Sequence, residues 1–250
     1  MTGKFYFILI VSFFLFAAKP FVDGSFKDGQ KKFARVKTAY SEKQDTVKNW
    51  LKQKSIDIST VNIFIRAFKK EGLIELWAKN KAQSEYKLIH TFDICASSGT
   101  IGPKRKQGDG QVPEGFYFID RFNPTSNFYL SLGINYPNES DKIFGQKGNL
   151  GGDVFIHGNC VTIGCLPITD DKIKELYVLA VEAKNAGQNK IPVDVYPCKM
   201  DDEGMAYLEK NGSSDLFTFW KNLKEGYDWF EKKKTVPKVY VDKKGLYSFN

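Results

Sequence analysis

Three residues of one short segment, IHGNCVTIGC, could carry out nucleophilic or metal chemistry: His157, Cys160 and Cys165. A cysteine attacks as its thiolate, and a free thiol with a pKa of about 8.5 is mostly protonated at neutral pH, so it needs a nearby base or cation. His157 is one of two histidines in the chain and lies eight residues before Cys165. A strand that ends at His157, followed by a short turn, would bring the imidazole and the thiol together.

Spacing alone leaves three interpretations of this segment open. In a thiol enzyme, His157 is the base, Cys165 is the nucleophile, and the amides near Gly164 and Cys165 hold the developing oxyanion. In a metal site, His157, Cys160 and Cys165 are ligands, although H-x2-C-x4-C is not a usual zinc spacing. The fourth ligand would then be His90, Cys95 or Cys198. In a structural turn, Cys160 and Cys165 could form a short-loop disulfide that silences the nucleophile.

The surrounding pattern predicts the elements that must position this segment. Pro113 and Gly115 predict a turn before the strand FYFI. Short apolar or alternating runs predict the strands, in the order VNIFIRAF, LIELWAK, YKLIHTFDIC, FYFI, FYLSLGINYP, DVFIHGN and IPVDVYPC. Apolar residues at helical spacing predict three helices, RVKTAYSEKQDTVKNWLKQKSI, TDDKIKELYVLAVEAKNAG and SSDLFTFWKNLKEGYDWFEKKK. The aromatic residues of the last helix are interpreted as a core stripe rather than a sugar-binding platform. A sheet flanked by helices is therefore expected.

The N-terminal stretch has the layout of a secretory signal peptide. Lys4 precedes an apolar run over residues 5–18, which small and polar residues follow, so a signal peptide over residues 1–24 is expected, with cleavage after residue 18 or 24. The apolar run is shorter than the ~20 residues that a spanning helix needs, so an uncleaved membrane anchor is the less favoured alternative to a signal peptide. No stable membrane insertion is expected after cleavage. Residues 25–250 are long enough for one domain with a substantial core.

Charge and cysteine content narrow the classes of partner. The formal net charge is +8, and for an exported protein this favours anionic envelope polymers or peptide carboxylates. A nucleic-acid partner is not expected, because no recognised binding motif accompanies the basic residues. Four cysteines in 250 residues are too few for a disulfide scaffold, although pairs could still form in an oxidising compartment.

The segment HGNCVTIGC resembles the signature of the L,D-transpeptidase catalytic domain (YkuD) family, in which a histidine and a glycine precede Ser/Thr-x-Gly-Cys. The matching positions are His157, Gly158, Thr162, Gly164 and Cys165. VPEGFYFI resembles the T-P-x-G-x-F/Y turn and strand of the family, with Val112 in place of threonine, and Ile163 stands where many members have a second histidine. IFIRAFKKEGLIELW and SDLFTFWKNLKEGYDWFEK resemble the YafK-type branch, and the resemblance runs from about Gln30 to Val241.

This resemblance implies an α+β fold, a β-rich sandwich or barrel-like catalytic core with peripheral helices. It implies one catalytic domain over residues 25–250, with an N-terminal helix and a C-terminal helical extension. Cys165 would be the nucleophile and His157 the general acid and base, while the Gly158 carbonyl orients the imidazole and the Gly164 amide contributes to the oxyanion site. The expected chemistry is acyl transfer through a thioester at diaminopimelate in peptidoglycan stem peptides, in the periplasm and without a cofactor or metal.

The acyl acceptor leaves the function open between related reactions. An amine acceptor makes the enzyme a transpeptidase, whereas water makes it a cysteine peptidase or amidase that cleaves stem-peptide or envelope-protein linkages with the same residues. An envelope protein could be the acceptor or the leaving group. An inactive envelope-binding module is the alternative from a different class.

The basic loop and the remaining cysteine and histidine residues offer further candidate roles. Lys104 and Arg105, in the basic glycine-rich loop SSGTIGPKRKQGDGQ, are either a clamp for stem-peptide carboxylates or a solvated loop, and Thr162 is a further candidate for substrate binding. Cys95 and Cys160 are interpreted first as small buried residues and second as redox or disulfide partners. The other histidine, His90, lies in a strand-like run and is expected to be a core or edge residue rather than a catalytic one.

Overall fold

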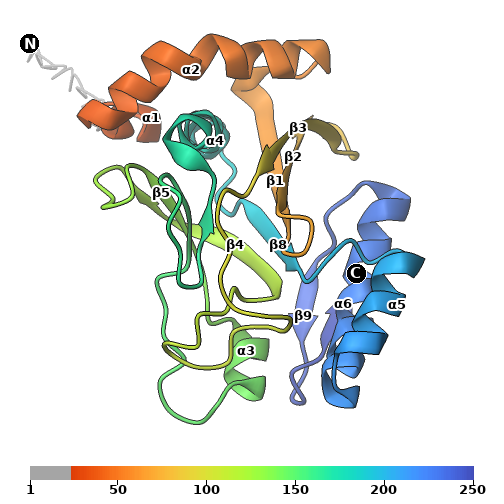
Figure 1. Cartoon of the computed structure of the whole chain (residues 1–250). Helices are drawn as coiled ribbons and strands as arrows, with labels where there is room; N and C mark the ends of the chain where they lie inside the picture. Colours follow the sequence, from red (N-terminus) through yellow and green to blue (C-terminus); the bar gives the residue numbers. More distant parts are fainter. Residues whose placement is uncertain (1–23) are drawn as a thin grey trace, which may run out of the picture.

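A curled sheet of eight strands forms the centre of the molecule, in the order β3-β2-β1-β8-β4-β5-β6-β7 (Figure 1). The structure is a computed structural model that describes residues 24–250, so the expected signal peptide lies outside the described residues except for Gly24. The strands are β1 (Val61–Phe68), β2 (Leu73–Asn80), β3 (Lys87–Asp93), β4 (Gly115–Asn123), β5 (Ser131–Ile134), β6 (Phe155–His157), β7 (Leu166–Pro167) and β8 (Pro192–Tyr196). The pairs β1–β8 and β6–β7 are parallel, and the other pairs are antiparallel.

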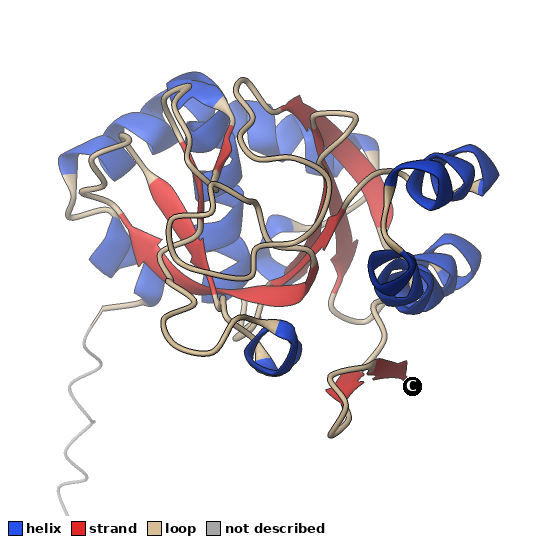
Figure 2. Ribbon diagram, turned by 60° about the horizontal axis from the view of Figure 1, so that its bottom comes forward, coloured by secondary structure: helices blue, strands red, loops and turns tan. Residues whose placement is uncertain are grey.

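Helices cover the sheet from two sides (Figures 1 and 2). They are α1 (Phe26–Gln30), α2 (Ala34–Gln53), the short 3-10 helix η1 (Ile58–Thr60), α3 (Glu139–Phe144), α4 (Thr169–Asn185), α5 (Asp202–Asn211) and α6 (Ser214–Lys233). Helices α2 and α4 lie together on one side, and α5 and α6 lie on the other (Figure 1). A separate hairpin of β9 (Val239–Val241) and β10 (Tyr247–Phe249) follows α6.

Strand β1 shows why a central strand of this sheet is apolar on both faces. Its odd-numbered residues, among them Ile63 and Ile65, are buried in the core shared with α2 and α4. Its even-numbered residues face the aromatic residues of α6: Phe64 packs on Phe230 at a ring-centroid distance of 4.8 Å. Arg66 is buried on this second face, where its guanidinium pairs with Glu75 at 2.7 Å. A strand covered on both faces is expected to be a nearly continuous apolar run, as VNIFIRAF is.

The predicted α+β class with a barrel-like core and peripheral helices is confirmed. Each predicted strand and helix is present within a few residues of its expected bounds. The aromatic stripe of α6 lies in the core, with Trp220 and Phe230 fully buried, as expected. The elements α1, η1, α3, α5, β7 and the β9–β10 hairpin were not predicted. Within residues 24–250, no helix combines the length and the apolarity needed to cross a bilayer.

Candidate active site

Parallel pairing of β6 and β7 places the histidine and the cysteine of the motif on the same face of two neighbouring strands. Ile156 pairs with Leu166 and His157 with Pro167, so Cys165, directly before β7, continues this register beside Phe155. Ile156 and Leu166 point into the main core. Side chains alternate along strands, so His157 and Cys165 project together from the opposite face, two residue positions apart on strands spaced about 4.8 Å.

Buried contacts hold the His157 imidazole in one orientation. The side chain is 1% exposed and its ring stacks on Phe128 at a centroid distance of 4.5 Å. The Nδ1–H donates to the carbonyl oxygen of Gly158, which leaves Nε2 unprotonated in the neutral ring. Burial lowers the pKa of His157 below its ordinary value of 6.5, against the opposing effect of the Gly158 hydrogen bond. The imidazole is therefore neutral at neutral pH, with a free lone pair on Nε2.

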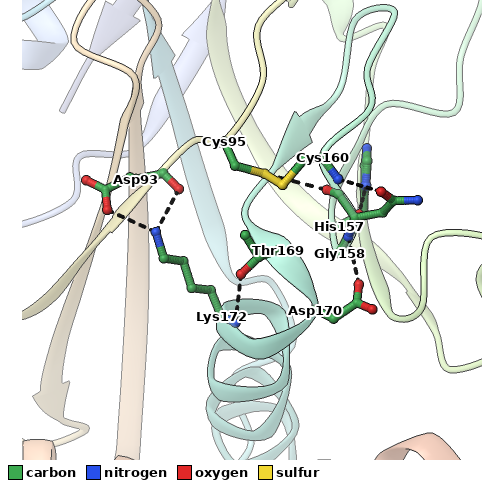
Figure 3. The surroundings of a disulfide bond; sticks show 9 residues. Asp93, Cys95, His157, Gly158, Cys160, Thr169, Asp170 and Lys172 are labelled. Carbon is green, nitrogen blue, oxygen red and sulfur yellow. Dashed lines mark hydrogen bonds and ion pairs between the residues drawn. A yellow bond between two sulfur atoms is a disulfide. The ribbon is translucent and has the colours of Figure 1, made fainter.

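Glycine is required at position 158 by close packing. A Cβ at this position would lie 2.5 Å from Asp170 Oδ1 and 2.8 Å from the carbonyl oxygen of Phe128. The same Asp170 oxygen, at the start of α4, accepts a hydrogen bond of 2.8 Å from the Asn159 amide. The turn that follows His157 is thus fastened to the first turn of α4 (Figure 3).

Thr162 builds the turn that presents Cys165. Its Oγ1 accepts hydrogen bonds from the amides of Gly164 at 3.2 Å and Cys165 at 2.8 Å, and it lies 2.9 Å from the Cys165 carbonyl oxygen. Gly164 has φ +132°, and a Cβ there would lie 2.8 Å from the Gln111 carbonyl oxygen. The structure therefore places the hydroxyl of Thr162 inside the turn and directs the Gly164 amide at that hydroxyl.

The Cys165 thiol is partly buried and protonated at rest. Burial raises its pKa above the ordinary 9.0, an effect that a hydrogen bond from the Phe155 backbone and the positive charge of Lys104 oppose. The Sγ lies 3.6 Å from the Asp153 carbonyl oxygen, as a thiol donor would. The thiol and the imidazole are therefore both neutral at rest, rather than charged as a thiolate and an imidazolium.

A disulfide joins Cys95 to Cys160 (Figure 3). Cys165 remains a free thiol. The bond links the end of β3 to the turn between His157 and Cys165. The first interpretation of Cys95 and Cys160 as small buried residues is wrong: Cys160 is exposed, and the two form a cross-link over 65 positions. A disulfide between Cys160 and Cys165 is likewise contradicted.

The metal interpretation does not fit this arrangement, because a sulfur bonded to Cys95 cannot be a thiolate ligand. Within residues 24–250, no cluster of three or more His, Cys, Asp and Glu side chains could hold a metal ion. His90, one of the candidates for a fourth ligand, stacks on Trp50 at a centroid distance of 4.1 Å. Cys198, another of these candidates, is a buried free cysteine far from the motif in sequence. Its thiol lies 3.8 Å from the carbonyl oxygen of Gly204.

Lys104 and Arg105 make internal contacts instead of facing the thiol pocket. The Lys104 ammonium is buried and donates to Asp109 Oδ1 at 2.9 Å and to a backbone carbonyl of its own loop at 2.8 Å. The Arg105 guanidinium lies 3.5 Å from the buried Asp141 carboxylate and 4.9 Å from the ring centroid of Phe219. The positive charge of Lys104 partly offsets the rise that burial causes in the pKa of Cys165.

A pocket of about 180 Å³ opens beside Cys165. The glycine-rich loop, the end of β1 and helix α5 line it, and the residues used below are Lys69, Lys70, Ser97, Glu114, Cys165 and Tyr207. The buried Glu114 carboxylate accepts from Lys69 Nζ and Trp220 Nε1, both at 2.7 Å. Sequence reasoning missed these residues, because an isolated lysine, glutamate or tryptophan carries no local signal of such a network.

Ser131 is a further missed neighbour of the imidazole. It pairs directly with His157 in the β5–β6 register, and its hydroxyl is buried. Within the described part of the chain this hydroxyl has no hydrogen-bond partner. A buried polar group without a partner is costly, and such groups occur at functional sites.

Comparison with known proteins gives the family. The model of the L,D-transpeptidase catalytic domain (YkuD) matches residues 62–195. YafK of Escherichia coli (strain K12), which is named as a proposed L,D-transpeptidase, is 37% identical over 181 residues, 72% of this chain and 70% of that protein. Among solved structures, the helical cell shape determining protein Pgp2 from Campylobacter jejuni is 16% identical, with a TM-score of 0.44, over 78% of this chain and 80% of that chain. Bdellovibrio bacteriovorus Bd1075 is 18% identical, with a TM-score of 0.40, over 72% of this chain and 77% of that chain. On the family match and the YafK similarity, the chain belongs to the L,D-transpeptidase catalytic domain family and is an enzyme of the L,D-transpeptidase type.

Proposed function

We propose that the protein modifies peptidoglycan by acyl transfer through a thioester on Cys165, with His157 as general acid and base. The observation that carries this proposal is the β6–β7 register, which projects a free thiol and a fixed imidazole from one face beside a pocket. The substrate is a stem peptide, attacked at the carbonyl of a diaminopimelate residue. Family membership supports this choice of substrate class.

The proton must move from Cys165 to His157 as the sulfur attacks, because both groups are neutral at rest. With Nδ1–H held by Gly158, the free Nε2 of His157 accepts the thiol proton as Cys165 Sγ attacks the carbonyl carbon. The carbon–sulfur bond forms and the carbonyl oxygen becomes an oxyanion. The carbon–nitrogen bond then breaks, and the leaving amine takes the proton from Nε2. An acceptor amine or water then attacks the thioester carbon and gives a proton to Nε2 of His157. The carbon–sulfur bond breaks, and the Cys165 sulfur takes that proton back as the thiol is restored.

We assign the oxyanion site to the turn that Thr162 builds. At rest the amides of Gly164 and Cys165 both donate to Thr162 Oγ1, so an oxyanion must compete with this hydroxyl. The Gly164 contact is the longer of the two, 3.2 Å against 2.8 Å, and is therefore the easier to exchange. In this scheme Thr162 shapes the turn and does not touch the substrate itself. The Gly164 amide, which Thr162 Oγ1 gives up, makes the contact.

The protein acts in the bacterial envelope after export. Residues 1–24 serve as the signal peptide, and residues 25–250 are one catalytic domain with α2 as the N-terminal helix and α5–α6 as the extension. The Cys95–Cys160 disulfide supports this location, because such bonds persist in oxidising compartments such as the periplasm. An envelope protein is a candidate acceptor or leaving group.

Intact-protein mass spectrometry tests this function. The mature protein is incubated with purified stem peptides, with and without an amine acceptor, and quenched with acid to trap the acyl-enzyme. An adduct is expected on the wild type and on Cys198→Ala, which removes the other free thiol, and none on Cys165→Ala. An amine-linked product identifies a transpeptidase, whereas only shortened or detached fragments identify a hydrolase. No adduct on a folded wild type would overturn the proposal.

A further inference from the structure

We propose that Lys70 and Tyr207 form a carboxylate-binding subsite in the pocket of Cys165. The inference rests on the proposed function, since it names the chemical group of the peptide that this pocket recognises. Both residues line the pocket that the nucleophile also lines. The pocket volume of about 180 Å³ lies below the ~300–1,000 Å³ that is usual for whole small-molecule sites, so it suits one part of a peptide.

The charges around the pocket leave Lys70 as its available cation. The neighbouring Lys69 ammonium donates three hydrogen bonds, to Glu114 Oε1 at 2.7 Å and to the carbonyl oxygens of Gly102 at 2.7 Å and Val112 at 3.1 Å. Lys69 and Glu114 therefore neutralise each other. Among residues 24–250, no carboxylate lies within 4.0 Å of the Lys70 ammonium. Lys70 is also exposed, so a ligand can reach it.

The carboxylate nearest in sequence, Glu71, is directed elsewhere. Its Oε2 accepts a hydrogen bond of 3.2 Å from the Lys199 amide, in the segment that leads to α5. The turn after β1 is itself fixed to the end of β8, because the Lys70 amide donates to the Pro197 carbonyl at 2.9 Å. The backbone that carries Lys70 is thus held in place before any ligand binds, which reduces the ordering cost of binding.

Tyr207 positions the ammonium from the other side. Its ring centroid lies 4.8 Å from Lys70 Nζ, a distance at which the ring face attracts a cation. Tyr207 belongs to α5, which follows the matched family segment at residues 62–195. The C-terminal extension therefore contributes one wall of the subsite. The extension also contacts the pocket through α6, where Trp220 Nε1 donates a hydrogen bond to Glu114, another lining residue.

The chemistry of this wall fits a carboxylate. An ammonium with no ion-pair partner attracts a carboxylate, and the exposed Ser97 at the pocket lining offers a hydroxyl with no hydrogen bond to another described residue. A stem peptide can present a carboxylate from the side chain of the attacked diaminopimelate, from the terminus of the leaving amino acid or from the α-carbon of its γ-linked D-Glu. All three sources share the chemistry that Lys70 would recognise.

Binding to an inactive protein tests the subsite independently of turnover. The probe is the synthetic tetrapeptide L-Ala-γ-D-Glu-diaminopimelate-D-Ala, and its Kd is measured by calorimetry on Cys165→Ala. Adding Lys70→Met should weaken binding by about five- to tenfold, the range between an exposed and a partly buried charged contact. Lys70→Arg should keep most of the affinity. The matched control Lys37→Met, an exposed lysine on α2, should change Kd by less than about twofold.

Two modified probes identify the source of the carboxylate. One carries an amide at the C-terminus and the other an amide on the diaminopimelate side chain. The probe that lacks the recognised carboxylate should have the same Kd for Cys165→Ala with and without Lys70→Met. The other amidated probe should still bind more weakly when Lys70→Met is present. No binding of the tetrapeptide, or an unchanged Kd in Lys70→Met, would overturn the subsite, whereas an equal loss on all three probes would place the recognised carboxylate on the γ-linked D-Glu. Failure of the proposed function is seen separately, as the absence of an adduct on wild-type Cys165.

Discussion

Removing the Cys95–Cys160 disulfide should lower the free energy of unfolding by about 4 kcal/mol. The bond closes a loop over 65 positions, and the chain-entropy relation gives this value for such a loop at 25 °C. Without the cross-link the unfolded chain has more conformations to lose on folding. At 2–4 °C per kcal/mol for a domain of this size, Tm should fall by about 8–16 °C.

Urea unfolding of the oxidised protein and of the variant Cys95→Ser/Cys160→Ser measures this difference. The slope of free energy against urea should also rise, because an unfolded chain without the cross-link exposes more surface. Cys165→Ser is the matched control, since it changes a thiol outside the disulfide, and it should lose less than about 1 kcal/mol. A loss below about 1 kcal/mol in the double variant would refute the reasoning. It would mean that the cross-link does not constrain the unfolded chain.

The remaining predictions concern the site and its supports. Because burial raises the pKa of Cys165 above 9.0 and lowers that of His157 below 6.5, alkylation by iodoacetamide should be slow at pH 7 and rise about tenfold per pH unit up to the thiol pKa. A rate that is already at its plateau at pH 7 would instead reveal a thiolate–imidazolium pair. Gly164→Ala should slow acylation more than about tenfold with the circular dichroism spectrum unchanged, since φ +132° and a close backbone carbonyl cost about 1–3 kcal/mol; normal acylation would contradict this. Trp220→Phe should cost about 1.5–3 kcal/mol in urea unfolding, because the buried Glu114 carboxylate loses a donor at 2.7 Å, and an unchanged midpoint would disprove the contact.

Local pattern was sufficient for most of the fold. The sequence predicts β1 and β2 from short apolar runs, and α2 and α6 from apolar residues at helical spacing, because each signal lies within one element. Strand β7 has two residues, too few to show a period. Helix α5 buries only Gly204 and Leu208, so its sequence has almost no apolar face to detect.

Pairings between distant residues could not be predicted in the same way. Four cysteines allow three complete pairings, and only the fold brings Cys95 within a Cα distance of 5.4 Å of Cys160. Lys104 belongs to a basic run that suggests an open clamp, but the loop folds back so that Asp109 pairs with its ammonium. In both cases the contact depends on how the chain closes, which sequence spacing does not report.

The sequence by itself determined which groups are available for the reaction: a histidine, a glycine and a cysteine at family spacing, on segments whose patterns predict a strand and a turn. Only the tertiary structure decided their state. The fold leaves Cys165 free by pairing Cys160 with Cys95, and it keeps both the thiol and the His157 imidazole neutral through burial. It also sets Tyr207 beside Lys70 from a helix more than a hundred residues away. The physical reason is that residue type is local, whereas burial and charge environment depend on every element that packs around a group.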